Sequence, residues 1–191
     1  SMGGVNADAA YSVTCDANDN YYLAGVFNGT ATFGLTNLTS AGLADAFVAR
    51  VNSNGTIQWA TQFGGISNDN AFGVTMAANG NIFVAGGFAD NITINGNTLS
   101  SAGSQDVIMV SVTNNGLITQ ALKFGGNKND QARGIIANNT GDAFICGYFE
   151  GIAVFGGYEL RAKGNINSSQ QTGDMFVYNV SAVYSTNPNA D

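Results

Sequence analysis

Three aspartates recur at one spacing along the chain, and their carboxylates are the groups best suited to bind a cation. Asp8, Asp69 and Asp130 are 61 residues apart, and each follows a Gly-Gly pair at the same distance. Carboxylate oxygens are common ligands of hard cations such as Ca²⁺. A partial ring of these side chains could therefore bind a cation or another ligand. The alternative is that each Asp accepts hydrogen bonds from backbone N–H groups of its own turn.

A second set of aspartates, Asp45, Asp106 and Asp174, precedes the third apolar segment of each unit. The same two interpretations apply to this set. The segment that starts at Asp16 opens like a calcium-binding loop, but it has Tyr21 in place of the required Gly and does not end in Glu. We interpret that segment as a hairpin turn.

The chain lacks the residues of the familiar catalytic sites. It contains no His, which excludes Ser-His-Asp and Cys-His catalysis and His-ligated zinc. Asp142, Glu150, Glu159 and Asp174 could supply the paired carboxylates of a glycosidase, but no motif surrounds them. We therefore predict a protein that is not an enzyme and that carries no cofactor.

One polar insertion is a candidate for ligand contact, because binding residues concentrate on loops held by a rigid scaffold. Residues 165–171 interrupt the spacing of the third unit. Asn165, Asn167, Gln170 and Gln171 are the candidate contact residues within it. The alternative is an insertion that the surface simply tolerates.

Charge and apolar content exclude several classes of partner. The chain has 6 Lys and Arg against 13 Asp and Glu, a net charge of −7, which has the wrong sign for nucleic acid. No apolar run approaches the length of a membrane span, so we expect no membrane insertion. Cys15 and Cys146 are too few for a disulfide framework and are expected to be small buried residues.

The aspartate spacing belongs to an internal repeat that covers nearly the whole chain. The repeat has a period of 61 residues and divides the chain into repeat 1 (3–63), repeat 2 (64–124) and repeat 3 (125–191). The third copy contains the insertion and lacks the closing Phe-Gly-Gly of the first two, so its last strand is divergent. Gly25, Gly86 and Gly147 share one offset, for which packing and turn geometry are the simplest explanation.

Each repeat is predicted to form four β-strands. In repeat 1 these are 11–15, 20–27, 46–51 and 56–63, all short, rich in β-branched and aromatic residues, and separated by Asn, Asp, Gly and Ser. An additional extended segment lies near Phe33. Four-stranded units at this period indicate blades of a β-propeller, with a β-solenoid as the rival.

The repeated residues also resemble a known family. The pattern joins the Gly-Gly-x-x-x-Asp-x-Ala segment at 64–71, the apolar segment 79–88, the Asp-Ala-Phe-Val-Ala-Arg segment 45–50 and the Asn-Gly…Phe-Gly-Gly segment 54–65. This pattern is similar to the SBBP-type β-propeller repeat, found mostly in large bacterial secreted or surface proteins. The resemblance covers residues 3–181. It implies a propeller scaffold at the cell surface or outside the cell, and no defined reaction.

Three blades are too few to close a propeller, which usually has about four to eight. The chain could be part of a longer propeller, two copies could form a six-bladed ring, or the exposed terminal faces could be covered otherwise. We expect open apolar faces to drive self-association.

These observations predict a noncatalytic β-propeller module that acts as a scaffold or as a recognition surface for protein or glycan. The alternative is a lectin-like or cation-binding propeller with one equivalent site in each repeat.

Overall fold

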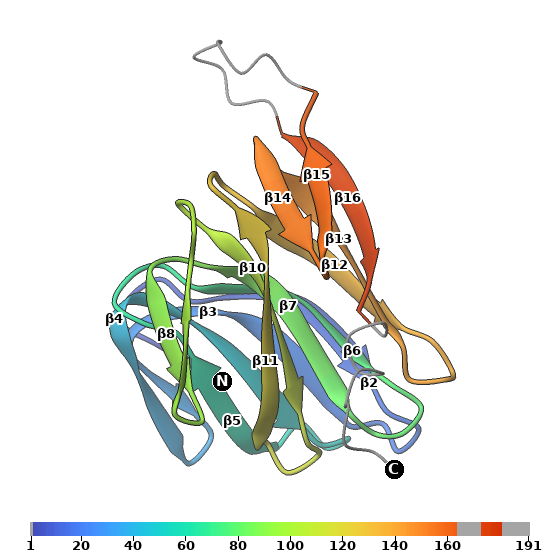
Figure 1. Ribbon diagram of the computed structural model, residues 1–191. Helices are drawn as coiled ribbons and strands as arrows, with labels where there is room; N and C mark the ends of the chain where they lie inside the picture. The colour runs from blue at the N-terminus through green and yellow to red at the C-terminus, as the bar shows by residue number, and fades with distance from the viewer. Residues whose placement is uncertain (1, 164–172, 181–191) are drawn as a thin grey trace.

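The chain folds into antiparallel β-sheets. The computed structural model describes residues 2–163 and 173–180, in which sixteen strands and no helix are found (Figure 1). Within those residues, no helix is long and apolar enough to cross a membrane. The predicted all-β character is therefore confirmed.

The strands are bounded as follows in chain order: β1 Met2–Gly4, β2 Ala9–Cys15, β3 Tyr21–Phe33, β4 Thr36–Val51, β5 Ile57–Phe63, β6 Asn70–Met76, β7 Ile82–Phe88, β8 Asn91–Ile94, β9 Asn97–Ser100, β10 Asp106–Val112, β11 Ile118–Gly126, β12 Gln131–Ala137, β13 Ala143–Phe149, β14 Ile152–Phe155, β15 Tyr158–Arg161 and β16 Asp174–Asn179.

Each repeat contributes one meandering sheet in which successive strands pair. The strand order is β2-β3-β4-β5 in repeat 1 and β6-β7-β10-β11 in repeat 2, as four strands per repeat predict. In repeat 3 the described strands form the three-stranded sheet β12-β13-β16. The divergent last strand of repeat 3 falls on residues 181–191, outside the described part of the chain. Among the described residues the sheets do not close into a ring.

The additional extended segment of each repeat is a hairpin that joins neighbouring repeats. It is formed by the ends of β3 and β4 in repeat 1, by β8-β9 in repeat 2 and by β14-β15 in repeat 3. The Gly-Gly pair that opens each repeat pairs with this hairpin. The paired residues are Gly4 with Ala31, Gly65 with Ile92, and Gly126 with Ala153. Strand β11 runs from repeat 2 into the first two residues of repeat 3, and its last residues pair with the hairpin of repeat 3.

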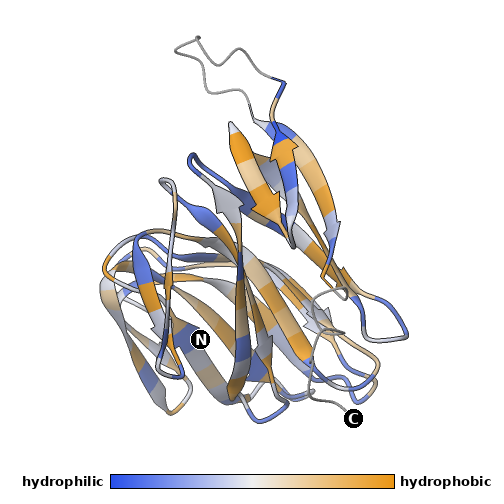
Figure 2. Ribbon diagram, in the orientation of Figure 1, coloured by the Kyte–Doolittle hydropathy of each residue, from blue (hydrophilic) through white to orange (hydrophobic). Residues whose placement is uncertain are grey.

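The sheets of the three repeats pack face to face. Every residue of β7 and β10 in the middle sheet is buried. One face of that sheet packs on repeat 1, with Val84 and Ile108 in the same cluster as Val48. The opposite face, with Phe83 and Met109, packs on repeat 3. Figure 2 shows hydrophobic residues concentrated on the central strands and hydrophilic residues in the turns.

The repeated glycine of the second strand sits opposite a β-bulge. The register between the first two strands shifts at the same place in each repeat, for example between Ala71 and Gly73. The shift brings a carbonyl oxygen against the glycine, so that a Cβ on Gly86 would lie 1.7 Å from Asn70 O. The corresponding distances are 2.0 Å at Gly25 and 1.9 Å at Gly147. Close backbone contact therefore explains this glycine, as packing arguments predicted.

We predict that Gly86→Ala destabilises the protein by about 3 kcal/mol or more, because the new Cβ has to displace a paired backbone carbonyl. Gly80→Ala is the control. Gly80 has a φ of 84° and no atom within 4 Å of a built Cβ, so its substitution carries only a backbone cost of about 1–2 kcal/mol. Urea unfolding of both variants measures the difference. Equal losses would contradict the steric explanation.

Candidate functional site

Each of the three spaced aspartates binds the backbone of the Gly-Gly segment in its own repeat. Asp69 accepts a hydrogen bond from Gly65 N to Oδ2 at 2.7 Å and one from Ala89 N to Oδ1 at 3.0 Å. Asp8 and Asp130 make the equivalent two bonds at distances between 2.6 and 3.2 Å. Each carboxylate therefore connects the Gly-Gly segment that opens its repeat to the end of the second strand.

The carboxylates of Asp8, Asp69 and Asp130 thus accept hydrogen bonds from backbone N–H groups. This is the second of the two interpretations of their spacing. Besides burial, the charges of Asp45 and Asp90 raise the pKa of Asp69, whereas the charges of Asp106 and Glu150 raise the pKa of Asp130. Asp69 and Asp130 thus lie at separate junctions between repeats, and Asp8 lies at the start of repeat 1. In residues 2–163 and 173–180 no group of three or more His, Cys, Asp or Glu side chains is arranged to hold a metal ion.

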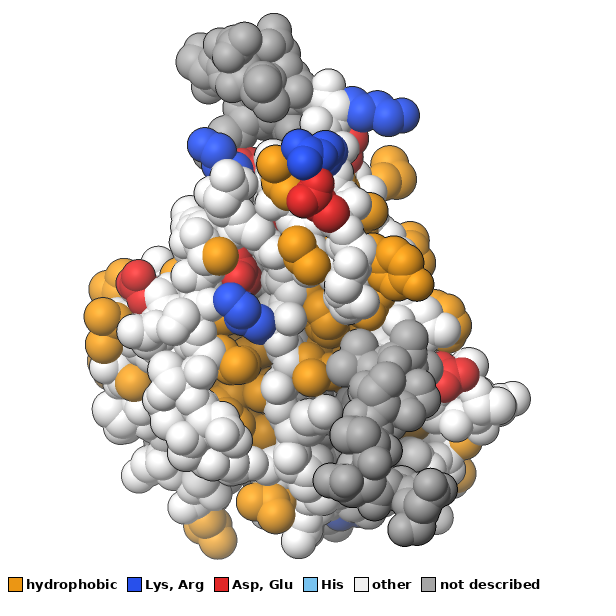
Figure 3. All heavy atoms as spheres, in the orientation of Figure 1, with side chains coloured by type: hydrophobic (Ala, Val, Ile, Leu, Met, Phe, Trp, Pro, Cys, Tyr) orange, Lys and Arg blue, Asp and Glu red, His pale blue; other side chains and the backbone are white. Residues whose placement is uncertain are grey.

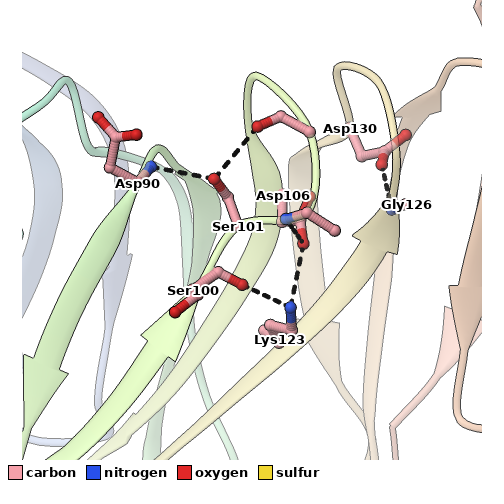
Figure 4. Close-up of polar contacts among 9 residues, drawn as sticks. Asp90, Ser100, Ser101, Asp106, Lys123, Gly126 and Asp130 are labelled. Atoms are coloured by element: carbon pink, nitrogen blue, oxygen red, sulfur yellow. Dashed lines mark hydrogen bonds and ion pairs between the residues drawn. The ribbon is translucent and has the colours of Figure 1, made fainter.

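The second set of aspartates lies at the same junctions. Asp106 Oδ2 accepts a hydrogen bond from Ala102 N at 3.1 Å and lies 3.5 Å from Lys123 Nζ. Figure 4 shows the Lys123 ammonium between Asp106 and Ser100, whose carbonyl it contacts at 2.5 Å. Asp130 and its bond to Gly126 lie beside this cluster in the same view.

Repeat 1 builds the same junction with a neutral side chain. Gln62 occupies the position of Lys123, and its Nε2 lies 3.1 Å from Asp45 Oδ2 and 2.8 Å from Thr39 O. The amide therefore reproduces the contacts of the ammonium without its charge. In repeat 3, Asp174 Oδ2 accepts a bond from Lys163 N at 2.8 Å, the counterpart of the Ala102 bond in repeat 2.

The junction carboxylates are buried, and burial disfavours their charged form. Asp45 and Asp69 are 0% exposed and Asp106 is 1% exposed. Within the part of the chain that the structure describes, Oδ1 of Asp45 and Asp106 has no hydrogen-bond partner. Burial raises the pKa of Asp69 and of Asp130 to about 6, although two backbone hydrogen bonds to each act in the opposite direction. Burial also raises the pKa of Asp45 and of Asp106.

The predicted ligand-contact residues lie outside the described part of the chain. Asn165, Asn167, Gln170 and Gln171 all fall within residues 164–172. Their proposed role in binding stays a prediction.

A pocket that the sequence did not identify lies where three equivalent turns meet. The turns join β2 to β3, β6 to β7 and β12 to β13, and the pocket has a volume of about 450 Å³. Its polar lining comes from Asp16, Asn18, Asn114, Asn138 and Asn139. Its remaining lining is mostly alanine, together with Cys15, Met76 and Gly80. The 61-residue register places these turns at one offset, but it carries no information on their distance in space.

The Asp16 carboxylate is held at the edge of this pocket. It accepts bonds from Asn18 N and Asn20 N, both at 2.9 Å, and Tyr22 Oη lies 3.2 Å from its Oδ2. Burial alone would raise the pKa of Asp16, but these bonds and one from the Asn20 amide together lower it. The segment is a hairpin turn, as its departures from a calcium loop predicted. The pocket therefore presents one ionised carboxylate among amides.

We predict that the protein becomes more stable when the pH falls from 7.5 to 5. Burial raises the folded-state pKa of Asp69 and of Asp130 to about 6, above the usual range of an aspartate, so the folded state binds more protons than the unfolded state in this range. Protonated Asp69 and Asp130 therefore increase the free energy of unfolding. This contribution is complete below about pH 4 and is lost as the pH rises through 6. Each carboxyl should contribute on the order of 1 kcal/mol between pH 7.5 and 5.

Urea unfolding across this pH range tests the prediction, and Asp69→Asn should reduce the slope of stability against pH. Asp8→Asn makes the same change at the start of repeat 1, where it replaces one of the two carboxylate oxygens that accept backbone N–H bonds with an amide NH2, and it controls for the lost hydrogen bond. A stability that rises with pH from 5 to 7.5 would contradict the assignment.

The chain was compared with protein families and with known proteins. No protein-family model matches the chain. A stretch of 107 residues, 54% of the chain, is 28% identical to part of the regulatory protein FlaEY of Caulobacter vibrioides. The matched stretch covers 11% of that protein, so the chain corresponds to a small part of its length. The similarity concerns a segment and assigns no activity.

Proposed function

We propose that the chain is a noncatalytic β-propeller module that presents loops for recognition of protein or glycan in a secreted or cell-surface protein. The observation that carries this proposal is the repeated packing of one sheet on the next through equivalent positions. The blades of propellers are four-stranded sheets that stack face to face, and this packing supports the proposal. The resemblance to SBBP-type repeats supports the same architecture and an extracellular location.

The pocket between the three inner turns is the best-supported recognition site. Its volume of about 450 Å³ lies within the range of small-ligand sites. Side-chain amides and a carboxylate can bind the hydroxyl groups of a sugar through several hydrogen bonds, and the alanines and Met76 offer an apolar surface to the ring. The Tyr22 hydroxyl, 2.8 Å from Asn114 Oδ1, links the first turn to repeat 2. A neutral glycan is the ligand class that this lining fits.

The lectin-like alternative predicts one equivalent site in each repeat. The pocket instead takes the turn between the first two strands of each repeat, together with Asn114 from the turn between β10 and β11. The three turns also differ, since the position of Asp16 is held by Ala77 in repeat 2 and by Asn138 in repeat 3. The lining therefore favours a single shared site.

We predict that a neutral oligosaccharide selected from a glycan array binds this pocket. Asn18→Ala and Asn139→Ala should each weaken binding about tenfold, because each removes hydrogen bonds to sugar hydroxyls. Isothermal titration calorimetry of the two variants and the unchanged protein measures the affinities.

Asn97→Ala is the matched control, since Asn97 is exposed on β9 and does not line the pocket. It should bind as the unchanged protein does. If no glycan binds, or if the pocket variants retain full affinity, the glycan site is excluded and scaffolding remains as the proposed role.

A further inference from the structure

The first and last sheets each have one face that no other described sheet covers. In repeats 2 and 3, we call the face that packs on the preceding repeat the N-face. In repeats 1 and 2, we call the face that packs on the following repeat the C-face. The equivalent faces of repeat 1 and repeat 3 take the same names. The C-faces of repeats 1 and 2 pack on the N-faces of repeats 2 and 3. In the described structure the N-face of repeat 1 and the C-face of repeat 3 have no such partner.

The C-face of repeat 3 exposes large apolar side chains at positions that are buried in the other repeats. Met175 is 87% exposed and Val177 is 76% exposed, whereas their counterparts Val107 and Met109 are 0% and 1% exposed. Ile136 on β12 is 64% exposed. Hydrophobic side chains are visible at the surface in Figure 3 on the side where Figure 1 places β16. This face has the composition of a sheet interior.

The N-face of repeat 1 is open in its inner half. Val13 is 61% exposed, whereas its counterpart Val74 is 5% exposed. Ala10 is exposed, and its counterparts Ala71 and Ala132 are 0% exposed. The outer half of this face forms a buried aromatic cluster with the repeat's own hairpin. The strands left open are β2 and the start of β3.

The two cysteines lie on these two open faces. Cys15 and Cys146 are exposed, contrary to the expectation that both are buried. The counterparts of Cys146 on the packed C-faces, Ala24 and Ala85, are 0% exposed. Met76, the counterpart of Cys15 in repeat 2, packs against the core between repeats 1 and 2. The thiols are therefore exposed because their faces lack a neighbouring sheet.

The polar parts of a junction are also present at the two ends. Asp8 already makes the two backbone bonds that Asp69 and Asp130 make at the internal junctions. At the other end, Asp174 accepts a hydrogen bond from Lys163 N. The equivalent bond is made by Asp106, which lies at the junction between repeats 2 and 3. The chain thus carries both halves of a third junction, at opposite ends and with complementary chemistry.

We propose that two copies of this chain associate head to tail, with the C-face of repeat 3 of each copy packed on the N-face of repeat 1 of the other. Two such contacts are related by a two-fold axis and leave neither face exposed. The ring would hold six sheets, within the usual range of about four to eight for propellers. Asp174 of one copy would then lie at the same junction as Asp8 of the other.

Sedimentation velocity across a range of protein concentrations tests this arrangement. The unchanged protein should form a species of twice the chain mass of 19.6 kDa. Met175→Asp and Val13→Asp each place a charge on one face and should each give a monomer. Both side chains are exposed in the single chain, so the variants should fold, which circular dichroism can verify. Leu35→Asp is the matched control, because Leu35 is fully exposed between the paired ends of β3 and β4.

A mixture of the two monomeric variants separates head-to-tail contact from symmetric contact. Met175→Asp retains an intact N-face and Val13→Asp an intact C-face, so the mixture should form a heterodimer through one junction. In the unchanged protein, alkylation of Cys15 and Cys146 should slow together as the concentration rises. A monomer at all concentrations would overturn the proposal, and so would a Val13→Asp variant that dimerises like the unchanged protein. The second result would indicate that two C-faces pair with each other.

Discussion

The structure depends on sheets that are apolar on both faces, because such a sheet is stable in water only when both faces are covered. Burial of apolar surface contributes about 25 cal/mol per Å², so a bare sheet face is costly. The middle sheet meets this requirement, and all residues of β7 and β10 are buried between the outer two sheets. Strand β16 of repeat 3 is the counterpart of β10, but exposed residues alternate along it with more buried ones. The reason is that one face of its sheet lacks a neighbour.

Close stacking of sheets also restricts the residues at the junctions. The Gly-Gly segment has to pass between a hairpin and a carboxylate, and a Cβ on Gly65 would lie 2.2 Å from Asn91 O. The adjacent backbone N–H groups need acceptors, and the Asp69 carboxylate supplies two of them. Burying this charge is unfavourable, which explains the raised pKa. Glycine and aspartate therefore recur together, because the close backbone contact leaves no room for a Cβ and the nearby N–H groups need a carboxylate as acceptor.

Much of the fold could be predicted from the sequence because the signals are local. Turn residues such as Asn79-Gly80 and alternating apolar segments identify strands without knowledge of their neighbours. The site was harder to predict, since the Asp spacing is compatible with a cation site as well as with backbone bonds. The turn pocket was missed because Asp16 and Asn138 lie 122 positions apart, and only the stacking of repeats brings them to one cavity. The exposure of both cysteines was also missed, because burial depends on which faces are covered.

The sequence by itself determined the period of 61 residues, the all-β character and the exclusion of His-dependent catalysis, since each follows from residue types and their spacing. Only the tertiary structure decided which positions are covered. Met109 and Val177 occupy equivalent positions in equivalent strands, yet Met109 is 1% exposed and Val177 is 76% exposed. The physical reason is that burial is a property of pairs of surfaces, and a sequence pattern describes one surface at a time.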